Sequence, residues 1–208
     1  MGFLRPSRSR VAAFTLLEMM VVVGVIAVVA AAAAPSIGSA RADARAQEVA
    51  LDMVRLLRRA RSASAGYGRA HLVIFDPASD SGNGSLTVYR GINNRCNAND
   101  WPLLIGGGCP GNDMCIDAVE GDQQTFGTSN YRMRAPDFAG GMQVCFEPTG
   151  ITRWRRTVAT AFTSNNVDGI GSLNGGFRFT VQRYNGEGDQ GVTRRVVLPL
   201  GSDARIQR

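Results

Sequence analysis

The chain shows three successive patterns of apolar and polar positions. Residues 14–34 form an apolar run of 21 residues in which the one charged side chain is Glu18. From Ile37 to Ala60, apolar residues recur mainly at spacings of three or four, which predicts an amphipathic helix. From Arg69 onward, short segments rich in β-branched and aromatic residues alternate with Gly, Asn, Asp and Pro. We therefore expect an α+β protein with a long amino-terminal helix, half membrane-spanning and half amphipathic, packed on a β-rich antiparallel head.

The first two patterns predict one continuous helix from Phe14 to Ser64. No glycine or proline interrupts residues 39–65, and Gly66-Tyr67-Gly68 is a suitable stop. Pro35 lacks an amide hydrogen and clashes with the preceding turn, so we expect it to bend the helix. The apolar stripe of the second half comprises Ile37, Ala40, Ala44, Val49, Ala50, Met53, Val54, Leu57 and Ala60.

The third pattern predicts strands separated by turns, without an internal repeat. Glu147-Pro148-Thr149-Gly150 is typical of a turn, and Asn185–Gly191 is typical of a hairpin loop. The expected strands are Ala70–Phe75, Leu86–Arg90, Tyr131–Arg134, Met142–Phe146, Thr157–Phe162, Phe177–Tyr184, Val192–Leu198 and Ala204–Gln207.

The apolar run is long enough to cross a membrane. As a helix it would span roughly 31 Å, which matches the hydrocarbon core of about 30 Å. Residues 1–13 precede it with Arg5, Arg8 and Arg10 and no acid. Because basic residues stay on the cytoplasmic side, the amino terminus is expected in the cytoplasm and the rest outside.

Three interpretations of this segment compete: a plain single-pass anchor, a secretory signal cut after a site such as Gly38-Ser39-Ala40, and a prepilin-type leader. The run exceeds the roughly 7–15 residues of a signal peptide's apolar region. Glu18 also argues against a plain anchor, because an acid at mid-membrane costs about 2.5–3.5 kcal/mol, and less near the edge. An intramembrane acid should have a partner.

The residues AFTLLEMMVVVGVIAVVAAAAAP, from Ala13 to Pro35, resemble the signal of type IV pilins and type II secretion pseudopilins. In that family a basic leader is cut before a Phe, Thr follows, Glu is the fifth mature residue, and about twenty apolar residues end in Pro. A cut between Ala13 and Phe14 reproduces this spacing. The family usually has Gly before the cut, where this chain has Ala13.

The resemblance implies roles for these residues. Prepilin peptidase would cut between Ala13 and Phe14 and methylate the new amine of Phe14. Glu18 would pair with that ammonium group in a neighbouring subunit, where an acid and an amine in low dielectric attract each other strongly. The implied layout is a leader at 1–13, a membrane and filament-core helix at 14–34, an amphipathic stem at 35–66 and a β-rich head at 67–208.

Within this superfamily the head most resembles the GspH/FimT (FimU) group of minor pilins and pseudopilins. The resemblance is patchy and rests on Leu56–Asp76, Val144–Arg153 and Arg194–Arg208. Where members often show Gly-Arg-x-Arg near the end, this chain has Ala204-Arg205-Ile206-Gln207, and Arg208 follows.

The four cysteines Cys96, Cys109, Cys115 and Cys145 all lie in the outward-facing head. An even number in an oxidising compartment favours disulfides. Four cysteines allow three pairings, and the sequence does not choose among them. Cys96–Cys109 with Cys115–Cys145 is the pairing we favour, because its first bond closes a local glycine-rich loop.

Composition adds charge to this picture. All 23 basic residues are arginine, and the sequence pI is about 9.8. The head from Ala70 has 13 arginines and 13 acids, but Tyr131–Arg208 is basic and Ala70–Asn130 is acidic. The stem arginines are interpreted most simply as a solvated helix face, and the alternative is contact with acidic surfaces of neighbouring subunits. An alternative function, DNA binding for uptake, would use Arg153, Arg155, Arg156, Arg194, Arg195, Arg205 and Arg208.

The sequence shows no catalytic constellation, no metal-ligand spacing and no cofactor motif, and its only histidine is His71. The resemblance implies a structural, non-enzymatic subunit that helps to initiate or cap a type IV pilus, a type II secretion pseudopilus or a competence apparatus. Implied partners are other pilins or pseudopilins, prepilin peptidase and an inner-membrane assembly platform. The implied location is the inner membrane with a periplasmic head, then the filament. A weaker alternative is a membrane-anchored periplasmic protein unrelated to filaments.

Overall fold

The computed structural model describes residues 15–97, 101, 114–120, 130–156, 161–163, 176–184 and 188–207. The chain divides into two compact units, Met1–Ala40 and Arg41–Arg208, which we describe separately and call the amino-terminal unit and the head unit. Helix α1 (Leu16–Tyr67) contributes to both units, and the strands pair in antiparallel sheets. The α+β prediction is confirmed.

The predicted long helix is present, with ends shifted by two or three residues. It was expected over Phe14–Ser64, and α1 runs from Leu16 to Tyr67. Gly68 follows with a φ of 64°, a left-handed conformation that commonly ends helices and that glycine adopts without strain. Within the predicted stop Gly66-Tyr67-Gly68, it is therefore Gly68 that ends the helix.

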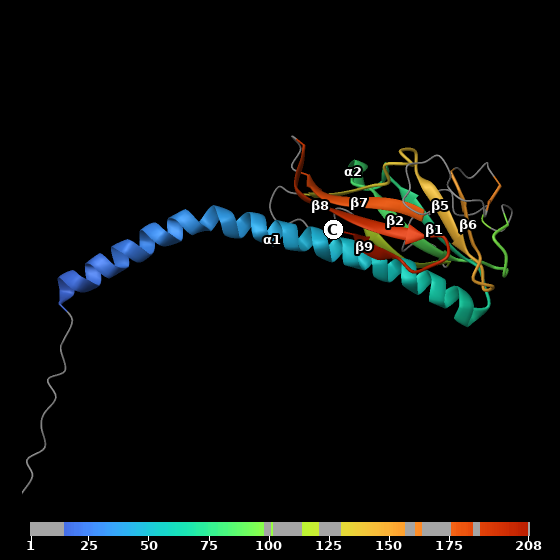
Figure 1. Ribbon diagram of the computed structural model, residues 1–208, viewed down its shortest axis with the longest axis horizontal. Helices are drawn as coiled ribbons and strands as arrows, with labels where there is room; N and C mark the ends of the chain where they lie inside the picture. Colours follow the sequence, from blue (N-terminus) through green and yellow to red (C-terminus); the bar gives the residue numbers. More distant parts are fainter. Residues whose placement is uncertain are drawn as a thin grey trace, which may run out of the picture. The chain divides into compact units, whose positions relative to one another are not determined.

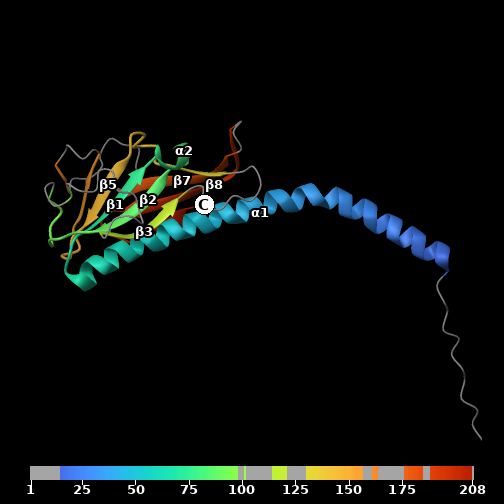
Figure 2. The same ribbon diagram turned by 180° about the vertical axis from the view of Figure 1, so that it is seen from behind.

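The described part of the head unit contains two antiparallel sheets and a one-turn helix, α2 (Ser79–Gly82). The five-stranded sheet has the order β3-β2-β1-β5-β6, and the four-stranded sheet has the order β4-β7-β8-β9. Figures 1 and 2 view them from opposite sides and show two layers. The bounds are β1 His71–Asp76, β2 Ser85–Arg90, β3 Cys115–Glu120, β4 Asn130–Arg134, β5 Met142–Phe146, β6 Thr152–Arg155, β7 Gly176–Tyr184, β8 Asp189–Pro199 and β9 Arg205–Gln207.

The main core lies where the head half of α1 meets both sheets. Ala50, Met53 and Leu57 of α1 share one buried cluster with residues of β1 and β7, such as Phe75 and Phe179. The rings of Phe75 and Phe179 meet edge to face, with centroids 5.5 Å apart. The helical spacing of the apolar stripe thus places one face of α1 against strands whose alternate residues point inward.

A second buried cluster covers the other face of the five-stranded sheet. It contains Leu72 of β1, Tyr89 of β2 and Cys145 of β5, with Cys96 and Trp101 from outside the strands. Strand β5 is therefore buried on both faces, and all five of its residues are buried. A strand that is covered on both faces has a mostly apolar sequence, as MQVCF does in β5. This explains why the bounds of β5 agree with the predicted strand.

Among the described residues, two strands were not predicted, and one predicted strand is largely untested. Strand β3 (Cys115–Glu120) lies in the cysteine-rich insertion, and β6 (Thr152–Arg155) has arginine at alternate positions. The strand expected at Thr157–Phe162 falls mostly outside the described residues, and Ala161 and Phe162 are not in a strand. Strand β8 begins at Asp189, three residues before its predicted start, so it includes part of the expected hairpin loop.

The turn at Glu147–Gly150 is confirmed, since the N–H of Gly150 donates to the carbonyl of Glu147 at 2.9 Å.

The stem arginines are more than a solvated face, because three of them join α1 to the sheets. Arg58 donates to the carbonyl of Ala204 at 3.0 Å, and Arg59 donates to Asp117 of β3 at 2.9 Å. Arg61 donates to Thr152 of β6 and to the carbonyl of Leu200, both at 2.9 Å. These contacts reach segments on both sheets and so fix the position of α1 along the head unit.

Packing of α1 predicts a large difference between two neighbouring substitutions. Met53→Ala in the isolated head (residues 41–208) should lower the free energy of unfolding by about 2–5 kcal/mol, because Met53 is 0% exposed. Leu51→Ala is the matched control; Leu51 lies on the same helix and is 37% exposed, so its cost should be well under half as large. Urea denaturation measures both, and equal losses would contradict the burial of this helix face.

Candidate assembly site

The first turn of α1 is closed by the side chain of Thr15. The N–H of Glu18 donates to Oγ1 of Thr15 at 3.2 Å, and the N–H of Met19 donates to the carbonyl of Thr15 at the same distance. A helix start leaves four N–H groups without intrahelical partners, and a capping side chain satisfies one of them. Sequence reasoning missed this role, although Thr-x-x-Glu before an apolar run is the spacing of a capping box.

Glu18 lies in the first turn of α1, and its side chain is exposed. An acid at this position interacts favourably with the positive end of the helix dipole. In an apolar surrounding that interaction does not offset the loss of hydration, so a cationic partner is still required. Ala13 and Phe14 lie outside the described residues, and the pairing of Glu18 with the Phe14 amine stays a prediction.

Within the described residues, the apolar surface of the amino-terminal unit is not covered by other parts of the chain. One helical segment of the described chain is long enough and apolar enough to cross a membrane. This segment is Leu16–Ala33, and none of it is buried. Burying a Val or Leu side chain contributes about 1.5–3 kcal/mol, so this surface is stable in lipid or among apolar helices rather than in water. Pro35 falls within the helical stretch of α1, but its side chain lies outside the described residues. The bend at Pro35 stays a prediction.

Strand β6 does not present its arginines as a free basic patch. Arg155 is 2% exposed, donates to Oε1 of Gln143 at 2.7 Å and lies over the ring of Phe162. Burial lowers the pKa of its guanidinium. Arg153 donates to Oε1 of Glu147 at 2.7 Å. Arg156 is exposed, with its guanidinium carbon 5.5 Å from the ring centroid of Phe138. Two of these three candidates for nucleic-acid contact are therefore engaged within the head.

The carboxy-terminal arginines divide between the two faces of the four-stranded sheet. Consecutive residues of a strand point to opposite sides. Arg194 is paired in register with the core residue Val181, whereas Arg195 is paired with Thr180 on the outer face. Arg208 lies outside the described residues. The outer face, which we call the arginine face, carries Arg132, Arg134, Arg178, Arg195 and Arg205.

Three side chains of the arginine face have partners. Arg134 pairs with Asp189 and Arg178 pairs with Asp137, each at 3.2 Å. Arg132 lies over the ring of Tyr184, 3.4 Å from its centroid. Arg195 and Arg205 are exposed and form no ion pair with the described residues. The uncompensated positive charge of this face is therefore concentrated on β8 and β9.

The disulfide prediction is correct in kind and wrong in its pairing. Cys96 is bonded to Cys145, with Cα atoms 5.9 Å apart, so neither Cys96–Cys109 nor Cys115–Cys145 forms. Cys115 is also disulfide-bonded, and its partner lies outside the described residues, as does Cys109. The physical reason is the second buried cluster, which places Cys96 against strand β5, between β1 and β6 in the five-stranded sheet. Among the described residues, no group of three or more His, Cys, Asp or Glu side chains could hold a metal ion.

Comparison with known proteins supports the interpretation of the amino terminus. Residues 8–34 match the family model described as a prokaryotic N-terminal methylation motif. Comparison with curated proteins and with solved structures finds no match. The matched segment contains Thr15, Glu18 and the exposed apolar part of α1.

The motif supports a type IV pilin-like protein. It points to a structural, non-enzymatic kind of protein, with pilins and prepilin peptidase as partners in general. Together with the single apolar helix found near the amino terminus of the described chain, it is consistent with anchoring in the inner membrane.

The Cys96–Cys145 bond predicts a measurable loss of stability when it is removed. It spans 49 residues, so chain entropy alone gives about 4 kcal/mol, and measured values are commonly about 2–4. The double variant Cys96→Ala/Cys145→Ala should therefore unfold at lower urea concentration than the wild-type head. Peptide mapping without reduction is the control, and it should recover a Cys96–Cys145 crosslink. Recovery of a Cys96–Cys109 crosslink instead would contradict the structure.

Proposed function

We propose that this chain is a GspH/FimT-like minor pilin or pseudopilin, a structural subunit that helps to initiate or cap a type IV pilus or a type II secretion pseudopilus. The observation that carries the proposal is the methylation motif at residues 8–34, on a helix whose apolar surface has no cover within the described chain. The GspH/FimT assignment is supported by the patchy sequence resemblance of the head and by its β-rich architecture behind a long helix.

Processing and assembly follow from the same segment. Prepilin peptidase would cut between Ala13 and Phe14 and methylate the amine of Phe14. The segment Phe14–Ala34 would leave the lipid and pack among the equivalent helices of other pilins or pseudopilins, driven from the inner-membrane assembly platform. The Glu18 carboxylate would then meet the Phe14 ammonium of a neighbouring subunit and set the axial register, because an unpaired charge in the apolar filament core is costly.

Glu18 provides the test of this proposal. Glu18→Ala should remove most of the chain from the sheared filament fraction while leaving it in the inner membrane, because the cation of the neighbour loses its partner. Glu48→Ala is the matched control: Glu48 lies on the same helix in an exposed ion pair with Arg45, and such pairs contribute little. Immunoblots of the filament and membrane fractions give the result.

Mass spectrometry of the same preparations checks the first step. The mature amino terminus should be N-methyl-Phe14. An intact leader would favour the membrane-anchored periplasmic alternative, and a terminus near Arg41, which lacks the apolar helix, would indicate a secretory signal. If the Glu18→Ala variant is processed correctly and reaches the filament fraction in wild-type amounts, the pairing of Glu18 with the Phe14 ammonium is wrong. The interpretation of residues 8–34 as a processing motif would still stand. The two results therefore separate an error in the processing site from an error in the role of Glu18.

A second candidate function, DNA binding during uptake, is favoured by Arg195 and Arg205 on the arginine face. Both are exposed on neighbouring strands, diagonal to one another in the β8–β9 register. If this function is correct, Arg195→Gln/Arg205→Gln should weaken DNA binding by the head and reduce the slope of log K against log salt by about 2. Arg55→Gln is the control, since Arg55 pairs with Asp52 on α1. Absence of DNA binding by the wild-type head at low salt would end this candidate.

A further inference from the structure

The only histidine of the chain is buried where α1 meets the five-stranded sheet. His71 begins β1 and is fully buried. Its Nδ1 lies 3.0 Å from the carbonyl oxygen of Arg69, which can only accept, so Nδ1 carries the hydrogen and donates it. In the neutral ring Nε2 is then an acceptor, and it has no hydrogen-bond partner among the described residues.

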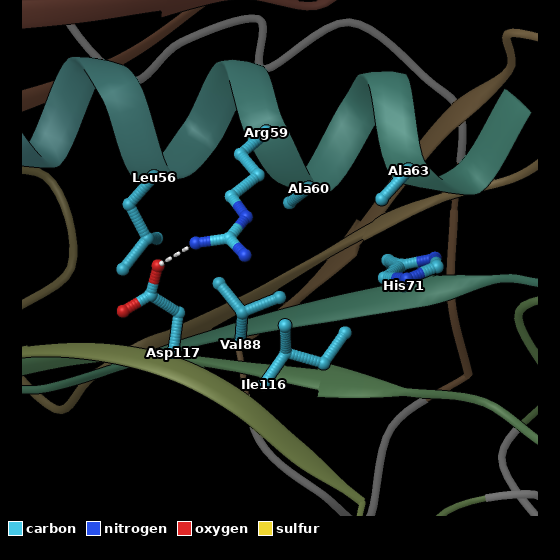
Figure 3. A pocket seen from close by; sticks show the side chains of 8 residues that line it. All are labelled: Leu56, Arg59, Ala60, Ala63, His71, Val88, Ile116 and Asp117. Atoms are coloured by element: carbon cyan, nitrogen blue, oxygen red, sulfur yellow. Dashed lines mark hydrogen bonds and ion pairs between the residues drawn. The ribbon is translucent and has the colours of Figure 1, made fainter. Parts of the chain in front are cut away.

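The side chain borders a small cavity between α1 and strands β2 and β3. Leu56, Ala60 and Ala63 of α1 line one side, and Val88 and Ile116 line the other (Figure 3). The cavity has a volume of about 10 Å³, which is close to the space of a single water molecule. At its edge the ion pair between Arg59 and Asp117, 2.9 Å long, joins α1 to β3. An imidazole in this position is packed between largely apolar walls.

The charged groups around His71 do not favour an imidazolium. Asp117 is the carboxylate that lines the cavity, and it is already paired with Arg59 of α1. Arg90 of β2 is directly opposite His71 in the strand register, and Phe146 of β5 is opposite it on the other side. The ring of Tyr67 is stacked 6.4 Å away. Burial lowers the pKa of His71 below its ordinary value of 6.5; the hydrogen bond to Arg69 opposes this, and the charge of Arg90 adds to it.

We propose that His71 makes the contact between the last turns of α1 and strands β1 to β3 sensitive to pH: with a neutral imidazole the contact is closed, and protonation of Nε2 loosens it. The proton comes from solvent through the cavity edge beside Asp117, and the ring changes from neutral to a charge of +1. The new N–H then has no acceptor among the described residues and faces apolar side chains, which is costly in a buried site. The segment that responds is Leu56–Tyr67, because it covers the cavity and ends beside His71.

The sign of the pH dependence follows from the lowered pKa of the folded state. Above about pH 6.5, histidine is neutral in both the folded and the unfolded chain, and the contact has its full stability. Below that value the unfolded chain binds the proton first, and the folded state loses stability until the pH reaches its own lower pKa. Each unit by which the pH falls within this window raises the equilibrium constant for opening by up to about tenfold.

The experiment uses the isolated head, because residues 41–208 form a compact unit that contains both buried clusters and the Cys96–Cys145 bond. Hydrogen exchange, corrected for intrinsic rates, should show protection of residues 56–67 falling between pH 7 and pH 5.5, while β7 and β8 change less. His71→Gln, which keeps an amide donor near Arg69, should flatten this dependence. Arg55→Gln, on the exposed side of the same helix, is the control and should retain it.

A second measurement does not depend on any variant folding. Since the chain has one histidine, its imidazole resonances report His71 alone, and they should titrate below pH 6.5 together with shifts of the α1 amides. A titration at or above 6.5, or unchanged protection of residues 56–67 across this range, would overturn the proposal. An equal pH dependence in wild type and a folded His71→Gln variant would overturn it as well.

Discussion

The packing of α1 on two sheets at once is the contact on which the head depends. The helix presents alanines at positions 46, 50 and 60 between larger residues such as Met53 and Leu57, and all are buried. Small residues let the strands approach the helix closely, and the larger ones fill the space between the sheets. Interiors are packed at nearly crystalline density, so a change of a single methylene group at these positions is felt. Neither sheet has another described helix of more than one turn to cover this face.

Polar contacts then specify where the helix lies. Apolar packing is not directional, whereas the bonds of Arg58, Arg59 and Arg61 each require a particular partner. The buried hydroxyl of Ser64 adds a bond to the carbonyl of Phe146 at 2.8 Å. These four side chains lie within seven residues of α1 and reach residues in or next to strands of both sheets. These bonds also account for part of the arginine content of the stem. Arg58, Arg59 and Arg61 donate hydrogen bonds to residues of the head unit.

The sequence predicted the helix, the α+β class and six strands close to their observed positions, because each depends on periodicity within one segment. It failed where a residue's environment is set by distant parts of the chain. Strand β6 was missed because Arg153 and Arg155 suggest a solvent-exposed segment. In the structure Arg153 donates to Glu147 and Arg155 donates to Gln143. The Cys96–Cys145 bond depends on a loop covering β5, which spacing does not encode. The opposite orientation of Arg194 and Arg195, and the cap at Thr15, could have been predicted from strand alternation and the capping-box spacing.

The contact along the head half of α1 also affects how the head unit responds to a mechanical force. A force that pulls the head half of α1 along its own axis acts on its contacts with the strands as shear. In shear, the core contacts of Met53 and Leu57 and the bonds of Arg58, Arg59 and Arg61 are strained together rather than one after another. The disulfide between Cys96 and Cys145 lies outside this load path, since both cysteines are on the opposite face of the five-stranded sheet.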